Sequence, residues 1–83
     1  MPKRMFYTYI LKSQKHGRYY IGSTNNIEDR LRRHNRGLNK STRLGIPWDL
    51  VRTETFETRQ EAYNRELQIK SYKGGEAFKR LIK

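Results

Sequence analysis

Two short segments rich in tyrosine and isoleucine stand near the start of the chain, on either side of a polar turn that ends in Gly17. Residues 5–13 and 18–23 have the composition and alternation of β-strands, and a connection of this length favours an antiparallel hairpin. Large side chains fall on both faces of the first segment, with Phe6, Thr8 and Ile10 on one and Tyr7, Tyr9 and Leu11 on the other. The chain is therefore predicted to begin with a β-hairpin.

A helix is predicted directly after the hairpin. Asn25 followed by Glu28 has the spacing of a capping box, which favours a helix start at this point. The helix is expected to run to about Arg36 and to stop at Gly37, since glycine is the usual residue just past a helix end. Its predicted apolar stripe consists of Ile27, Leu31 and Leu38.

The second half of the chain predicts one more strand and two more helices. The predicted elements are a basic loop at 38–47, a strand at 48–56, a helix at 58–72 and a final helix at 76–83. Thr58 and Glu61 form a second capping box, and Gly74 and Gly75 separate the last two helices. The order β-β-α-β-α-α predicts an α+β fold, in which a small three-stranded antiparallel sheet is packed by helices. We expect one domain over residues 1–83, because the chain is short.

The charge of the chain indicates a polyanionic partner. Lysine and arginine number 19 against 8 acidic residues, a net charge of +11. A small domain this basic typically binds nucleic acid, although charge alone does not separate DNA, RNA and an anionic membrane, and the alternative is a solvated, highly soluble surface. The absence of cysteine excludes disulfides and thiolate metal sites. With neither a leader-like start at Met1 nor an apolar run long enough to span a membrane, we expect a cytoplasmic protein that does not enter membranes.

Hairpin pairing brings two tyrosines together. If Ser13 pairs with Arg18 across the turn, Tyr9 lies opposite Gly22 and diagonally beside Tyr20 on the same face, roughly 7–8 Å away. Both rings could then reach one substrate group, and Gly22 would leave space opposite Tyr9 for something to approach the backbone. The alternative is that both tyrosines are ordinary strand residues that pack on the core.

Arg30 and His34 lie one helical turn apart and share a face of the first predicted helix. Arginine can bind a phosphate with two parallel hydrogen bonds, and histidine can contact a phosphate or transfer a proton. The alternatives are that Arg30 is one solvated cation among several, and that His34 is a surface residue that suits the negative end of the helix dipole.

Glu66 is the acidic residue whose position is hardest to explain by helix capping. Ala62 and Ile69, one turn before and after it, place its side chain toward the buried side of the predicted helix. A carboxylate there is costly unless it is paired or binds a metal ion. Glu66 is therefore a candidate metal ligand, with an ion pair to Lys70 or Arg30 as the alternative.

These residues resemble the motifs of the GIY-YIG nuclease superfamily. The run from Tyr20 to Thr24, YIGST, matches the second half of the family's two-part motif, and the first half keeps its tyrosine at Tyr9. Tyr7 and Thr8 depart from the glycine and isoleucine that usually stand there. The likeness covers nearly the whole chain and is closest to small stand-alone members, similar to the catalytic module of excision-repair and homing endonucleases.

The resemblance implies a metal-dependent endonuclease that hydrolyses phosphodiester bonds, with a role in DNA repair or recombination. It implies that Tyr9 is or assists the general base, that Tyr20 binds the phosphate or a metal-bound water, and that Arg30 neutralises charge on the phosphate. His34 falls at the accessory histidine, and Glu66 at the sole protein ligand of Mg²⁺ or Mn²⁺. Because free tyrosine titrates near 10, we expect positive charge from Arg30, the metal or Lys12 to acidify Tyr9.

The expected partner is nucleic acid, with DNA favoured over RNA, and a protein partner for targeting is a further expectation. Residues expected to contact nucleic acid are Gly22, Ser23, Lys40, Arg43, Lys70 and Lys73, with Ser41 and Thr42 in the same basic loop. Two alternatives explain the charge without catalysis. One is a basic DNA- or RNA-binding module, and the other is a structural protein of the ribosome or nucleoid, with steep salt-dependent binding and no need for metal.

Overall fold

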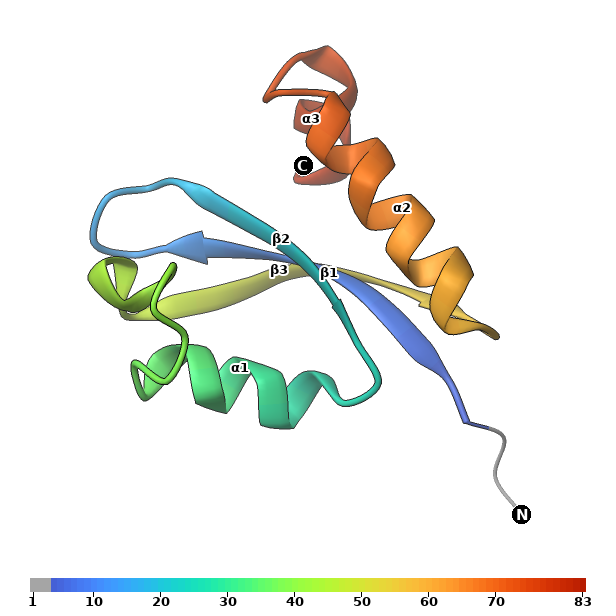
Figure 1. The fold of residues 1–83 in the computed structure, drawn as a ribbon. Helices are drawn as coiled ribbons and strands as arrows, with labels where there is room; N and C mark the ends of the chain where they lie inside the picture. The colour runs from blue at the N-terminus through green and yellow to red at the C-terminus, as the bar shows by residue number, and fades with distance from the viewer. Residues whose placement is uncertain (1–3) are drawn as a thin grey trace.

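The computed structural model describes residues 4–83 and has the predicted order of elements (Figure 1). The elements are β1 (Phe6–Ser13), β2 (Tyr19–Thr24), α1 (Ile27–Asn35), a 3-10 helix η1 (Arg43–Gly45), β3 (Trp48–Phe56), α2 (Arg59–Ser71) and α3 (Glu76–Leu81). The predicted α+β class and the three-stranded antiparallel sheet are confirmed. The expectation about a leader at Met1 lies outside the described residues. Within residues 4–83, no helix is both long and apolar enough to cross a membrane.

The hairpin of β1 and β2 has the predicted register. The Ser13 amide donates to the Arg18 carbonyl at 2.9 Å, and Tyr9 pairs with Gly22. Gly17 supplies the positive φ of 75° that this turn requires, a conformation that glycine adopts without steric cost. Strand β1 is central in the order β2-β1-β3, so both of its edges are hydrogen-bonded. The register fixes which side chains of β2 share a face with Tyr9.

Each face of the sheet is covered by different helices, and β1 contributes to both cores (Figure 1). On the α1 face, Tyr9, Leu11 and Trp48 are buried against Ile27 and Leu31 of the helix and against Tyr20 and Ile46. On the other face, Ile10 packs with Ile69 of α2 and Phe78 of α3, with Tyr72, Leu81 and Ile82 around them. The alternation predicted for β1 therefore separates two small cores.

Helix α1 starts one residue later than the capping pattern predicts. Its N-cap is Asn26, whose side chain accepts from the Asp29 amide at 3.0 Å. The reason is that β2 stays paired through Thr24, which lies opposite Tyr7, so only Asn25 and Asn26 remain for the connection. The Thr24 hydroxyl oxygen then accepts from the Asn26 amide at 3.1 Å and holds this turn.

The end of α1 confirms Gly37 as the stop and corrects the place of Leu38. The amides of Gly37 and Leu38 donate to the carbonyls of His34 and Arg33, which are the two hydrogen bonds of a Schellman motif. Gly37 has a φ of 74°, so the chain turns away from the helix there. Leu38 is 62% exposed as a result and does not belong to the apolar stripe.

Helix α2 begins as predicted, because Thr58 and Glu61 form a complete capping box. Arg65 anchors the helix to β3 through Glu54, at 2.7 Å between Nε and Oε1, and Arg52 binds the same carboxylate at 2.8 Å. The following turn, with Gly74 at a φ of 76°, leads into α3. This last helix ends at Leu81 rather than continuing to Lys83.

Candidate active site

Tyr9 and Tyr20 share the α1 face of the sheet, as the register predicts, with ring centroids 6.3 Å apart. Tyr9 is only 2% exposed, whereas Tyr20 is half-buried. The Tyr20 ring also meets the His34 ring edge-on at 4.8 Å. The two tyrosines therefore form one cluster with a histidine from α1, in addition to their part in the core.

Gly22 has a different role from the predicted one. The space opposite Tyr9 is filled by the Tyr9 side chain itself, because a Cβ built on Gly22 would lie 2.5 Å from the Tyr9 hydroxyl oxygen. Gly22 is buried, and the Tyr9 ring occupies the space that a ligand would need there. What a glycine provides here is room for the Tyr9 ring to lie flat against β2, which directs the hydroxyl toward α1.

His34 is fully buried, which excludes the alternative of a surface histidine and also the expectation of a direct phosphate contact. Its Nε2 lies 3.0 Å from the Tyr9 hydroxyl oxygen, and its Nδ1 lies 2.8 Å from Oγ1 of Thr42. The side chain reaches inward because position 34 lies one turn after Arg30 and beside the apolar stripe of α1. His34 thus connects the Tyr9 hydroxyl to the loop after α1.

Thr42 is the site residue that sequence reasoning placed wrongly. It was expected to lie with the phosphate-contacting loop residues, but it is 2% exposed and hydrogen-bonded to His34. Its carbonyl accepts from the indole Nε1 of Trp48 at 2.8 Å, and its hydroxyl donates to the Asn39 carbonyl at 3.3 Å. No pattern of the loop sequence distinguishes Thr42 from Ser41, because the pairing depends on how 38–47 folds over α1.

Burial shifts the pKa of Tyr9 and the pKa of His34 in the directions that favour the uncharged form of each side chain. Burial raises the pKa of Tyr9 well above its usual range, and Tyr20 raises it further, while Arg30 acts in the opposite direction without overcoming them. The expectation of an acidified Tyr9 is therefore wrong for the chain by itself. Lys12 does not help, because it is exposed and lies 5.7 Å from the Tyr19 ring on the other face of the sheet. Burial also lowers the pKa of His34, with Arg30 and Arg33 adding to the effect.

Arg30 and Glu66 join the same cluster from two different helices. Arg30 is half-buried, and its positive charge opposes the rise in the Tyr9 pKa. Glu66 is 9% exposed, as predicted, and its charge also acts on Tyr9. Its Oε2 lies 2.6 Å from Nζ of Lys70, so the ion pair predicted as the alternative for this carboxylate is formed.

The carboxylate of Glu66 suits a divalent metal ion, but the Lys70 ammonium already binds this carboxylate. Among residues 4–83, no group of three or more histidine, cysteine, aspartate or glutamate side chains is placed to hold a metal. Mg²⁺ does not need such a group, because it binds through one or two carboxylates together with waters and substrate phosphate. Glu66 already holds one positive charge, the Lys70 ammonium, and its oxygen donors suit a hard cation. A metal at this site would compete with Lys70.

The remaining candidates for nucleic-acid contact are distributed over several surfaces. Lys40 and Lys73 are exposed, and Arg43 is exposed but donates from Nε to the Gly37 carbonyl at 3.1 Å. Ser23 pairs with Thr8, so it belongs to the α2 face of the sheet rather than to the face of Tyr9. Lys70 lies at the site itself, where its pKa is raised by Glu66 and by Tyr20.

Comparisons with known proteins show what this chain is similar to. A family model described as the GIY-YIG catalytic domain matches residues 5–78. A UPF0213 protein of Clostridium perfringens is 48% identical over 67 residues, which are 80% of this chain and 71% of that protein. A UPF0213 protein of Staphylococcus saprophyticus is 42% identical over 67 residues, which are 80% of each chain. The solution NMR structure of a UPF0213 protein from Bacillus halodurans is 34% identical, with a TM-score of 0.49, over 81% of this chain and 71% of that one.

Proposed function

The chain belongs to the GIY-YIG catalytic domain family, and we propose that it is a metal-dependent endonuclease that hydrolyses phosphodiester bonds in DNA. The observation that carries the proposal is the hydrogen bond between the Tyr9 hydroxyl and His34, surrounded by Arg30, Tyr20 and Glu66. An ordinary core tyrosine does not need a buried histidine, an arginine and a carboxylate around its hydroxyl. A role in DNA repair or recombination is part of the same proposal.

The proton path in this proposal runs from water through Tyr9 to His34. His34 is neutral at working pH because its pKa is lowered, so one of its ring nitrogens is free to accept a proton. We assign the proton to Nδ1, since Oγ1 of Thr42 lies at 2.8 Å and the Thr42 proton points to the Asn39 carbonyl. The side-chain nitrogen of Asn39 lies farther from Nδ1, at 3.4 Å, so the Thr42 oxygen is the nearer partner.

Tyr9 then acts as a relay. Its hydroxyl donates to Nε2 of His34, and its oxygen accepts the proton of the attacking water as its own proton moves to the histidine. A stable phenolate is never required, which removes the conflict between a general base and a raised pKa. Thr42 holds the imidazole in the orientation that this transfer needs.

The charged groups around Tyr9 stabilise the phosphate. Arg30 is positioned to offset negative charge that develops on the phosphoryl oxygens, and Tyr20 can donate its hydroxyl to the same group. Glu66 would hold the Mg²⁺ or Mn²⁺ ion, which when bound supplies Lewis-acid stabilisation of the leaving oxygen. Lys70, released from Glu66, remains beside Tyr20 as a second cation for the phosphate.

The ion pair between Glu66 and Lys70 favours a second candidate function, that of a DNA- or RNA-binding module without nuclease activity. In that case Lys70 satisfies Glu66 permanently, and the net charge of +11 accounts for binding. The two functions differ in whether they need a metal ion and in whether removal of the Tyr9 hydroxyl changes the activity. Both predict salt-sensitive binding, so binding alone does not separate them.

A cleavage assay tests the proposal. Labelled single-stranded, duplex, flapped and four-way-junction DNA, and RNA, are incubated with the protein in Mg²⁺, Mn²⁺ or EDTA. Glu66→Gln and Tyr9→Phe should each abolish cutting and retain binding, whereas Glu76→Gln, an acid with 80% of its side chain exposed, should change neither. Cutting that persists in EDTA or in Glu66→Gln contradicts the metal assignment. Salt-sensitive binding with no cutting of any substrate supports the binding module.

A further inference from the structure

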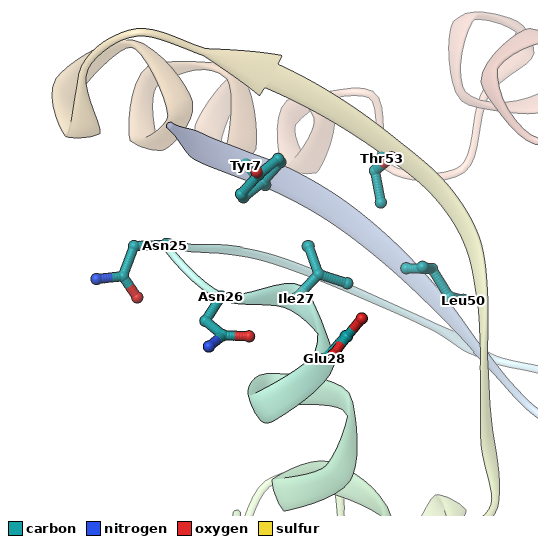
Figure 2. Close-up of a pocket in the computed structure, with 7 residues that line it drawn as sticks. All are labelled: Tyr7, Asn25, Asn26, Ile27, Glu28, Leu50 and Thr53. Carbon is teal, nitrogen blue, oxygen red and sulfur yellow. The ribbon is translucent and has the colours of Figure 1, made fainter. Parts of the chain in front are cut away.

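A groove with a volume of about 500 Å³ opens on the α1 face of the sheet, and none of the proposed chemistry uses it (Figure 2). Its apolar walls are the ring of Tyr7 and the side chains of Ile27 and Leu50. Its polar lining consists of Asn25, Asn26, Glu28 and Thr53. The volume falls within the range of cavities that hold small organic ligands.

The lining suits a planar ring with a polar edge. Tyr7 and Thr53 come from the sheet, and Ile27 and Glu28 face them from the first turn of α1 (Figure 2). Aromatic and aliphatic walls contact the flat faces of such a ring, and amide, hydroxyl and carboxylate groups contact its edge. A nucleobase has this distribution of apolar faces and edge donors and acceptors.

The polar group that α1 turns toward the groove is the Glu28 carboxylate (Figure 2). The side chain of Asn26 turns away from Tyr7 and Leu50 in the same view, and its Oδ1 accepts from the Asp29 amide at 3.0 Å, so it caps the helix. Glu28, when ionised, can only accept. A base with an exocyclic amine complements this carboxylate, which adenine and cytosine provide and thymine does not.

The same carboxylate makes the groove unsuitable for a phosphate. Glu28 lies in the lining, and like charges at short range repel each other. Because the chain carries a net charge of +11, basic surfaces are available elsewhere for the backbone of a nucleic acid. The groove therefore selects the base and not the phosphate.

The groove lies close to the candidate active site but on the other side of α1. Tyr7 is two residues from Tyr9 on the same strand and face, about 7 Å along β1. Glu28 and Arg30 point to opposite sides of α1, since two helical residues are separated by about 200°. A nucleic-acid strand that crosses the first turn of α1 would cover about 10–12 Å, roughly three stacked nucleotides.

We propose that this groove binds an unpaired or extruded base of the substrate strand, with a preference for a base that carries an exocyclic amine. The proposal rests on the proposed nuclease function, because it places the recognised base about three nucleotides from the phosphate at Tyr9 and Arg30. It adds base selection to a chain whose charges otherwise bind any sequence alike.

NMR titration of the ¹⁵N-labelled protein with adenosine, thymidine and inorganic phosphate tests the groove directly. Adenosine should shift the amide signals of Tyr7, Asn25 and Thr53, with thymidine at least about fivefold weaker. Inorganic phosphate should leave these signals in place. Asn25→Ala and Glu28→Gln, both at exposed positions, should each weaken adenosine binding about fivefold, whereas Asn64→Ala, exposed on α2, should not.

The proposal is overturned if adenosine shifts none of these signals up to its solubility limit, if thymidine binds as well, or if phosphate competes with adenosine. Unchanged adenosine binding in both variants also overturns it. Nucleosides contain no phosphodiester bond, so this result does not depend on cleavage. A nuclease without base binding, and base binding without nuclease activity, are therefore distinguishable outcomes.

Discussion

Replacing Gly22 by alanine should inactivate the site although every reacting side chain keeps its chemical identity. The added methyl would lie 2.5 Å from the Tyr9 hydroxyl oxygen and 2.6 Å from its Cζ, so the ring must move by about 0.9 Å to reach the 3.4 Å of ordinary contact. Tyr9 is 2% exposed, and the ring can move only away from β2. The hydroxyl would then lose its 3.0 Å contact with His34.

The expected loss follows from that displacement. A misplacement of about 1 Å costs on the order of 10²-fold in rate, equivalent to about 2.7 kcal/mol of activation free energy. Overpacking should cost about 1–3 kcal/mol of folding free energy, offset in part because alanine stabilises a strand more than glycine does. Initial rates of cleavage at saturating substrate measure the first quantity, and thermal unfolding measures the second.

A double-mutant cycle separates this explanation from general damage to the fold. If Gly22→Ala acts through the Tyr9 hydroxyl, it should cause little further loss of rate in a Tyr9→Phe background. Asn64→Ala, an exposed position on α2, should cut normally. Wild-type turnover in Gly22→Ala, or rate losses that add fully in the double mutant, would refute the reasoning.

Three further predictions concern protonation and charge. Because His34 must be neutral and its pKa is lowered, the cleavage rate should rise with pH only below about 6.5 and stay flat above neutrality; a rise that continues toward pH 10 would indicate a Tyr9 phenolate as the base. Lys70→Met removes the competitor for Glu66, so Mn²⁺ should bind more tightly by calorimetry while cleavage slows; unchanged affinity would exclude the competition. Glu54 has a lowered pKa, chiefly because Arg65 hydrogen-bonds it, so its stabilisation is present above about pH 4.5 and lost below. Glu54→Gln should therefore cost about 1–2 kcal/mol of unfolding free energy at pH 7 and little near pH 3, measured by urea denaturation.

The hairpin could be predicted in detail because its information is local. Alternation decides the face of each side chain, and the turn length decides the register, so the proximity of Tyr9 and Tyr20 follows from the sequence. Local patterns also predicted the capping box at Thr58 and the stop at Gly37. The start of α1 was displaced by one residue, because strand pairing of Thr24 is a long-range contact that a capping pattern does not contain.

What the sequence by itself determined is the set of elements, the shared face of the two tyrosines and the basic charge of the chain. Only the tertiary structure decided what surrounds Tyr9. The loop 38–47 folds over α1 and buries Thr42 against His34, and α2 brings Glu66 with Lys70 to the cluster. These contacts join residues that are distant in sequence, and they set the burial that shifts the pKa of Tyr9 and His34. Burial depends on the whole fold, so no local pattern encodes it.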